Sequence, residues 1–103
     1  MPYTLVFDEV MKKQLVKAAK NQQLKEMLTA MFDEIEQKGP DAGVLVDSHL
    51  FIYEMKSKHP PVRLYFKHHL ATNEMYVFEF EMKTSPKKQK KTINKLRFKA
   101  GNL

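Results

Sequence analysis

Three short runs in the middle of the chain alternate apolar and polar residues, and they constrain the fold more than any other feature. They span residues 51–56 (FIYEMK), 62–67 (VRLYFK) and 75–83 (MYVFEFEMK). Alternation with a period of two is typical of half-buried β-strands. We therefore expect three strands with one apolar, core-facing side, which carries Phe51, Tyr53, Met55, Val62, Leu64, Phe66, Tyr76, Phe78, Phe80 and Met82.

The opposite side of this predicted sheet is rich in charges, and we expect it to face solvent and to hold the functional site. Its residues are Ile52, Glu54, Lys56, Arg63, Tyr65, Lys67, Val77, Glu79, Glu81 and Lys83. Antiparallel sheets commonly leave one face solvated. An alternative is purely structural. In that case the charges form a cross-strand ladder of ion pairs, each of which contributes little to stability.

Helical patterns precede and follow the three strands. A short strand at residues 3–7 leads through Asp8, a plausible N-cap, into a helix over residues 10–20. Residues 23–38 predict a second helix that ends at Gly39. Its core-facing stripe is Leu24, Met27, Leu28, Met31, Phe32 and Ile35. Ser85 and Pro86 predict the start of a third helix, which runs to about Lys99.

The predicted order of elements is β-α-α-β-β-β-α, with turns at residues 57–61 and 71–74 and a further extended piece at residues 44–46. This order predicts an α+β fold in which two N-terminal helices cover one face of an antiparallel sheet. With 103 residues, 43% of them hydrophobic, the chain is expected to form a single domain over residues 1–103. The basic C-terminal helix lies within it, at residues 85–103.

The positive charge of the chain is concentrated at its C-terminal end. Residues 83–103 hold eight of the 18 Lys and Arg residues and none of the 12 acidic ones. A local basic block is the usual footprint of nucleic-acid binding. A solvated helix face, or a clamp for an acidic partner, is the alternative.

Other classes of protein find little support in the sequence. There is no cysteine, no apolar run of the roughly 18 residues that suggest a membrane span, and no Gly-rich phosphate loop. The N-terminus lacks the pattern of a signal peptide. We therefore expect a cytoplasmic protein that needs no cofactor and no metal. Surface positions are the default for His49, His59, His68 and His69, and a general acid at one of them is the alternative.

Several motifs occur together in an order that resembles a known family. These are Tyr53-Glu54-Met55-Lys56, then Val62-Arg63-Leu64-Tyr65, then Met82-Lys83-Thr84-Ser85-Pro86 and the lysine-rich helix. The opening YTLVFDEVMKKQL fits as well. Together they resemble the RelE/HigB/ParE toxin superfamily, and its HigB-like branch most closely. The resemblance covers nearly the whole chain in order and length.

The resemblance implies the toxin component of a type II toxin–antitoxin system, a metal-independent mRNA endonuclease that acts on the ribosome and is neutralised by a cognate antitoxin. Lys56 stands where the family usually has arginine, and Arg63 stands at its most recognisable arginine. Both would clamp phosphate, while Glu54, Tyr65, Glu81 or a histidine would transfer protons. The RNA backbone would be held by Lys83, Lys87, Lys88, Lys90, Lys91 and Lys95.

The last strand departs from the family's pattern. Glu79 and Glu81 stand where lysines are common, so Glu81 is either a general base or a group that neutralises Arg63. Two alternatives to the nuclease stay open for this reason. One is a non-catalytic RelE-fold module that binds nucleic acid or protein, and the other is a ParE-like inhibitor of DNA gyrase.

Overall fold

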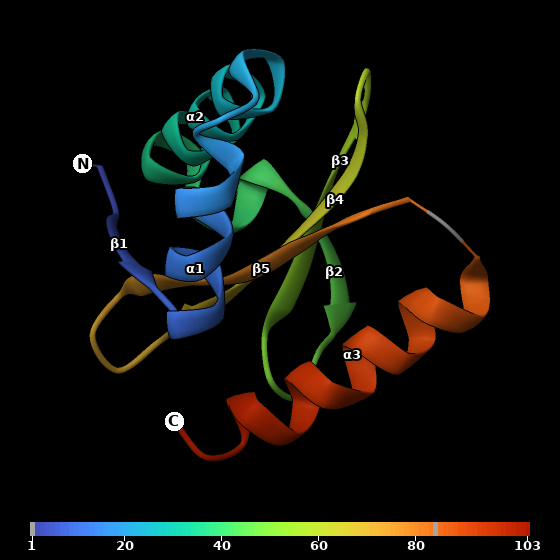
Figure 1. Ribbon diagram of the computed structural model, residues 1–103. Coiled ribbons are helices and arrows are strands. Elements are labelled where there is room, and N and C mark those ends of the chain that lie inside the picture. The colour runs from blue at the N-terminus through green and yellow to red at the C-terminus, as the bar shows by residue number, and fades with distance from the viewer. Residues whose placement is uncertain (1, 84) are drawn as a thin grey trace.

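The computed structural model describes residues 2–83 and 85–103, so Thr84 of the quoted motif lies outside the described residues. The elements follow the predicted order (Figure 1). They are β1 (Thr4–Phe7), α1 (Glu9–Ala18), α2 (Gln22–Lys38), the 3₁₀ helix η1 (Gly39–Ala42), β2 (Val44–Asp47), β3 (Ile52–Lys58), β4 (Pro61–His69), β5 (Glu74–Met82) and α3 (Pro86–Ala100). The predicted α+β class is confirmed, and no helix of the described residues is long and apolar enough to cross a membrane.

The sheet has the strand order β1-β5-β4-β3-β2. Strands β3, β4 and β5 form the predicted antiparallel series, and the extended piece expected near residue 44 is the edge strand β2, antiparallel to β3. The first strand differs from the expectation, because β1 lies parallel to β5. The sheet is therefore mixed. The helical pair α1 and α2 separates β1 from the rest of the sheet in sequence, and β1 adds to the edge of the last strand.

Local residues end the helices and turns as the sequence predicts. The Asp8 carboxylate accepts a hydrogen bond from the Val10 amide and caps α1. Gly39 follows α2 with φ of +57°, a conformation that glycine adopts without strain. A Cβ at this position would also collide with the ring of Tyr3. Asn73 takes the left-handed conformation, which asparagine tolerates, in the predicted turn at residues 71–74 between β4 and β5.

The main core lies between the sheet and the pair α1 and α2, as predicted. Its buried residues are Met11, Ala18, Leu28, Met31, Ile35, Met55, Leu64, Phe66, Met75 and Val77. Phe32 only borders this core, where its ring meets the ring of Phe7 edge-on at 5.1 Å. The α2 stripe therefore packs mainly through Leu28, Met31 and Ile35.

Leu28→Ala tests this packing at a position that is 1% exposed. We expect the free energy of unfolding to fall by about 2–5 kcal/mol, since the lost side chain leaves a cavity in a packed interior. Phe32→Ala should cost less because that ring is partly exposed. Urea denaturation of both variants measures the difference, and equal losses would show that α2 packs differently.

The expectation of an open charged face is wrong. α3 lies across the sheet face opposite α1 and α2, so helices cover both faces (Figure 1). Its Leu96 and Ala100 form a second apolar cluster with Ile52, Tyr65 and Phe78. The apolar stripe of α3 requires such a surface, and the sheet provides it beside the charged residues.

A β-bulge corrects the predicted assignment of faces in β5. Tyr65 pairs with Glu79 while Phe66 pairs with Val77, so Phe78 has no partner in the register. The extra residue reverses the side-chain alternation. Phe78, expected in the main core, therefore packs under α3, and Val77, expected on the charged face, lies in the main core.

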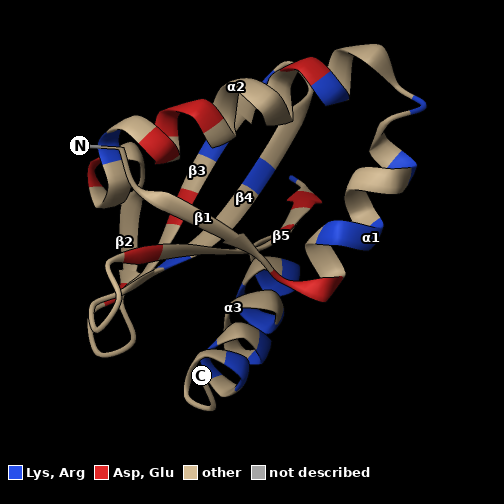
Figure 2. Ribbon diagram, turned by 90° about the vertical axis from the view of Figure 1, so that its left-hand side faces the viewer, with Lys and Arg blue, Asp and Glu red and all other residues tan. Residues whose placement is uncertain are grey.

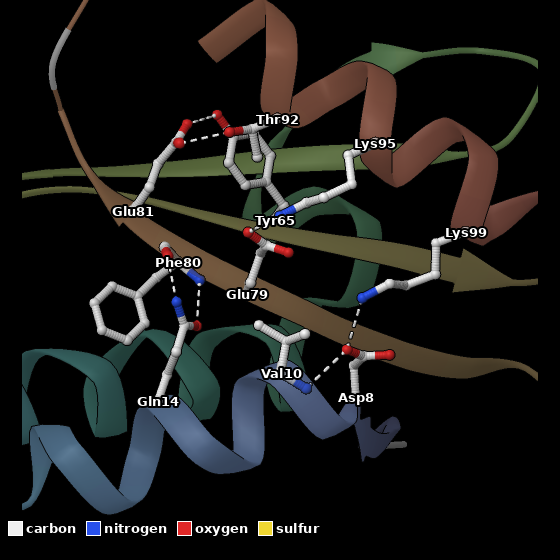
Figure 3. Close-up of polar contacts among 10 residues, drawn as sticks. All are labelled: Asp8, Val10, Gln14, Tyr65, Glu79, Phe80, Glu81, Thr92, Lys95 and Lys99. Carbon is white, nitrogen blue, oxygen red and sulfur yellow. Dashed lines mark hydrogen bonds and ion pairs between the residues drawn. The ribbon is translucent and has the colours of Figure 1, made fainter. Parts of the chain in front are cut away.

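Gln14 of α1 pairs with the edge of β5 that faces away from β4, beyond the point where β1 ends. Its side-chain amide donates to the Phe80 carbonyl at 2.8 Å and accepts from the Phe80 amide at 2.9 Å (Figure 3). The side chain thus imitates a neighbouring strand for one residue. This contact fixes the part of β5 that carries Glu79 and Glu81.

Candidate functional site

The strand register brings the predicted site residues into two adjacent rows. Lys56 lies opposite Arg63, and Arg63 lies opposite Glu81. In the next row Glu54 lies opposite Tyr65, and Tyr65 lies opposite Glu79. Lys56, Arg63, Glu54, Tyr65 and Glu81 therefore share one face of three neighbouring strands.

Glu54 is the centre of the basic side of this cluster. Arg63 donates from its NH1 nitrogen to Oε1 of Glu54 at 3.1 Å, and the Lys56 ammonium lies 3.6 Å from the same oxygen. The Glu54 side chain is 3% exposed, against 18% for Arg63 and 55% for Lys56. Arg63 is thus held by Glu54, and neither Glu79 nor Glu81 neutralises it by a direct ion pair.

Tyr65 and Glu81 form a second, more enclosed contact. The Tyr65 hydroxyl donates to Oε1 of Glu81 at 2.7 Å, and the Thr92 hydroxyl of α3 donates to Oε2 at 2.7 Å (Figure 3). Tyr65 is fully buried. Burial, followed by the hydrogen bond to Glu81, raises the pKa of the Tyr65 phenol well above its usual value. The phenol stays protonated near neutral pH, where it can donate a proton but cannot act as a base.

Polar residues along α3 reach the carboxylates beneath the helix, and we call this set of contacts the α3 seam. Gln89 donates to Glu54 at 2.6 Å, Thr92 to Glu81 at 2.7 Å, Lys95 to Glu79 at 2.9 Å and Lys99 to Asp8 at 2.9 Å. Figure 3 shows Thr92, Lys95 and Lys99 pointing from α3 towards these acids. The seam gives the Glu79 carboxylate its one hydrogen-bond donor among the described residues. It adds a further contact to Glu54, Glu81 and Asp8, which also accept from Arg63, Tyr65 and the Val10 amide.

Sequence reasoning missed most of the seam. It selected Lys95 only as an RNA-binding residue, and it assigned no role to Gln89 or Thr92. The signal was present, since Gln89, Thr92, Leu96 and Ala100 follow each other at the three- and four-residue steps of one helical stripe. Gln89 is half-buried and Thr92 is buried, and polar positions in such a stripe indicate polar partners on the opposing surface.

The six lysines predicted to bind RNA divide into separate groups. Lys87, Lys88, Lys91 and Lys95 line a cavity of about 670 Å³ together with Ser85 and Thr92, and we call it the α3 cavity. Lys90 lines a different hollow of about 370 Å³, beside Arg97. Lys83 follows β5, and its amide donates to the Pro61 carbonyl. Figure 2 shows the basic residues along α3, which forms a positively charged rod against the sheet.

Arg97 and Asp47 anchor the C-terminal half of α3. Arg97 donates to the Asp47 carboxylate at 2.7 Å, and the amides of His49 and Leu50 donate to the other oxygen at 3.0 and 2.9 Å. The hydrogen bond from the Leu50 amide, helped by Arg97 and His49, holds the pKa of Asp47 below its usual value. This ion pair ties α3 to the segment between β2 and β3.

Asp47→Asn should therefore destabilise the fold in a pH-dependent way. A carboxyl whose pKa is depressed by folding stabilises the protein above its unfolded pKa of about 3.9, and this contribution is lost as the pH falls through the lower folded value. We expect a loss of roughly 1.5–3 kcal/mol at pH 7, the range for hydrogen bonds to charged groups. The loss should shrink below about pH 4. Urea midpoints at pH 7 and pH 3 measure it, and a pH-independent difference would contradict this account.

The histidines do not assemble into a metal centre in the part of the chain that the structure describes. No three His, Asp or Glu side chains gather there as ligands would. His68 instead contacts the Asn73 side chain at 2.8 Å, in the turn between β4 and β5. The site described above is therefore built from carboxylates, cations and one phenol.

Comparison with known proteins identifies the fold that carries these residues. No model of a known protein family matches the sequence, and no curated protein matches it either. Solved structures do match, and their common fold is that of the E. coli toxin RelE. Since sequence identity to the three structures described next is 21% or less, the likeness shows that this chain has the RelE fold.

Three of these structures can be compared directly. Isolated E. coli RelE matches with a TM-score of 0.69 and 18% identity, over 91% of this chain and 98% of RelE. A mutant of E. coli RelE in the free state gives 0.71 and 18%, over 92% and 98%. The intact E. coli RelBE toxin–antitoxin complex gives 0.65 and 21%, over 81% and 99%. The predicted RelE-like fold is confirmed, while the closer resemblance to the HigB-like branch stays a prediction.

Proposed function

We propose that this protein is a toxin of RelE type, a metal-independent endonuclease that cleaves mRNA on the ribosome, in the cytoplasm. The observation that carries the proposal is the row of Lys56, Arg63 and Glu81 on a RelE fold, next to the lysines of α3. Cleavage by the RNA's own 2′-hydroxyl needs cations beside the phosphate and a group that accepts the hydroxyl proton. A basic surface would hold the RNA in place.

In the proposed reaction the 2′-hydroxyl attacks the adjacent phosphate and the 5′-oxygen leaves. Arg63 and Lys56 stabilise the negative charge that grows on the phosphate oxygens. Glu54 positions Arg63, because its buried carboxylate holds the NH1 nitrogen. Glu81 or a histidine accepts the hydroxyl proton. Tyr65 can protonate the leaving oxygen only where α3 gives RNA access to it, since the phenol is fully buried beneath that helix.

An antitoxin is the second partner that the proposal includes. The E. coli relative forms a toxin–antitoxin complex with RelB, and a RelE mutant has been solved with a peptide of that antitoxin. By analogy we propose a cognate protein that neutralises this chain. Sequencing the gene next to the one that encodes this chain would identify a candidate antitoxin.

A non-catalytic module is the second candidate function, and the α3 seam favours it. In that case Glu54, Glu79 and Glu81 serve only to dock α3, and the lysines bind nucleic acid without cutting it. A ParE-like inhibitor of gyrase would likewise need no nuclease site. Inducible expression separates the candidates, since growth arrest with cut mRNA supports the nuclease. Arrest with intact mRNA and inhibited gyrase would support the third candidate, and absence of arrest would support the module.

A further inference from the structure

The α3 cavity has the composition of a site for phosphate. Its lining consists of four lysines and two hydroxyl residues, and it includes no acidic residue. Among the described residues no acid forms an ion pair with Lys87, Lys88 or Lys91, so three of the ammonium groups have no internal counter-ion. Three exposed lysines without an ion-pair partner, on one side of a helix, form a positively charged surface that attracts a phosphate group.

Lys95, the fourth lysine of the cavity, differs because it also belongs to the α3 seam. Its ammonium lies 2.9 Å from Oε2 of Glu79, whose side chain is 8% exposed (Figure 3). The other oxygen of Glu79, Oε1, is buried and finds no hydrogen-bond donor among the described residues. Lys95 is thus the only cation within ion-pair distance of this buried carboxylate in the described part of the chain.

We propose that the α3 cavity binds a phosphodiester group of RNA, and that this phosphate competes with Glu79 for Lys95. The inference rests on the proposed function only in naming RNA as the source of the phosphate. Binding and docking of α3 are then linked reciprocally. RNA in the cavity weakens the contact between α3 and β5, and removal of the Glu79 charge strengthens RNA binding.

Fluorescence anisotropy with a labelled, 2′-O-methylated single-stranded RNA tests the proposal without cleavage of the probe. Lys91→Ala should weaken binding several-fold, because it removes a cavity lysine. Lys13→Ala is the matched control, since it removes the same charge from an exposed position of α1, outside the predicted RNA-binding lysines. Equal losses for both variants would overturn the cavity and indicate diffuse attraction to the whole protein.

Competition for Lys95 is tested by Glu79→Gln, which should tighten binding several-fold. Asp33→Asn, on the exposed side of α2, changes the net charge equally and should have a much smaller effect. In a Lys95→Ala background the gain from Glu79→Gln should disappear, as expected for two directly coupled residues. The same gain in both backgrounds would contradict competition. If Glu79→Gln does not fold, Glu79→Asp, which withdraws the carboxylate from Lys95, should also tighten binding.

The outcomes separate this inference from the proposed function. If the cavity variants change RNA affinity as predicted but the protein cuts no RNA, the inference stands and the proposed nuclease function fails. If the protein cleaves mRNA but the cavity variants leave its RNA affinity unchanged, the nuclease function stands and the inference fails.

Discussion

Arg63→Lys is expected to lower the rate of RNA cleavage by about 10²–10³-fold, the usual cost of removing one donor to a transition-state oxyanion. The guanidinium can hold Glu54 through NH1 while another nitrogen binds a phosphate oxygen, and a lysine ammonium cannot reproduce this planar geometry. Because the charge is kept, the melting temperature should change little. Single-turnover cleavage by the two purified proteins measures the effect.

Arg97→Lys is the control for this substitution. Arg97 also pairs with a carboxylate, but it does so with Asp47 at the C-terminal half of α3, away from the row of Lys56 and Arg63. We expect its cleavage rate to stay near that of the unsubstituted protein. Equal rates for Arg63→Lys and Arg97→Lys would show that the catalytic site lies elsewhere on the molecule.

RNA affinity is expected to fall by about 10²-fold between 50 and 200 mM salt if about five phosphates are neutralised, because each contact on a single strand contributes about 0.7 to the log–log slope. Five cations are available for these contacts: Lys87, Lys88 and Lys91 of the α3 cavity, together with Lys56 and Arg63. Anisotropy titrations at several salt concentrations give the slope.

Two double variants show whether α3 is responsible for the salt dependence of RNA affinity. Lys87→Ala with Lys91→Ala should flatten the slope by about 1.4, two contacts' worth. Lys13→Ala with Lys17→Ala removes the same charge from exposed positions of α1 and should leave the slope unchanged. A flat dependence on salt in the unsubstituted protein would exclude a phosphate-binding surface altogether.

Local signals predicted most of the fold. Alternating runs placed β3, β4 and β5. Asp8 and Ser85 marked helix starts because their side chains accept hydrogen bonds from the first turn, and Gly39 and Asn73 marked turns because they tolerate positive φ. The bulge at Phe78 could not be predicted in the same way. Val77 and Phe78 are adjacent and both apolar, so either could have faced the main core.

The residues of the candidate site that share one sheet face could be predicted, but their burial and their partners on α3 could not. Periodicity alone put Lys56, Arg63 and Glu81 on one face, and the register confirms that they are neighbours. The lysine-rich pattern of α3 predicted a basic, nucleic-acid-binding surface, and it did not predict that the other side of this helix packs on the charged face of the sheet. That side of the helix buries Tyr65 and encloses Glu54 and Glu79, which a solvent-facing sheet would have left free.

The chemistry of the cut ends tests the proposed nuclease most directly. The protein is added to a purified translation system, and the ends of the mRNA fragments are analysed. Attack by the 2′-hydroxyl predicts a 2′,3′-cyclic phosphate upstream and a 5′-hydroxyl downstream, and a single 2′-deoxy substitution at the cut position should abolish cleavage there. Fragments with 5′-phosphates, cleavage that persists at the 2′-deoxy position, or intact mRNA would contradict the account.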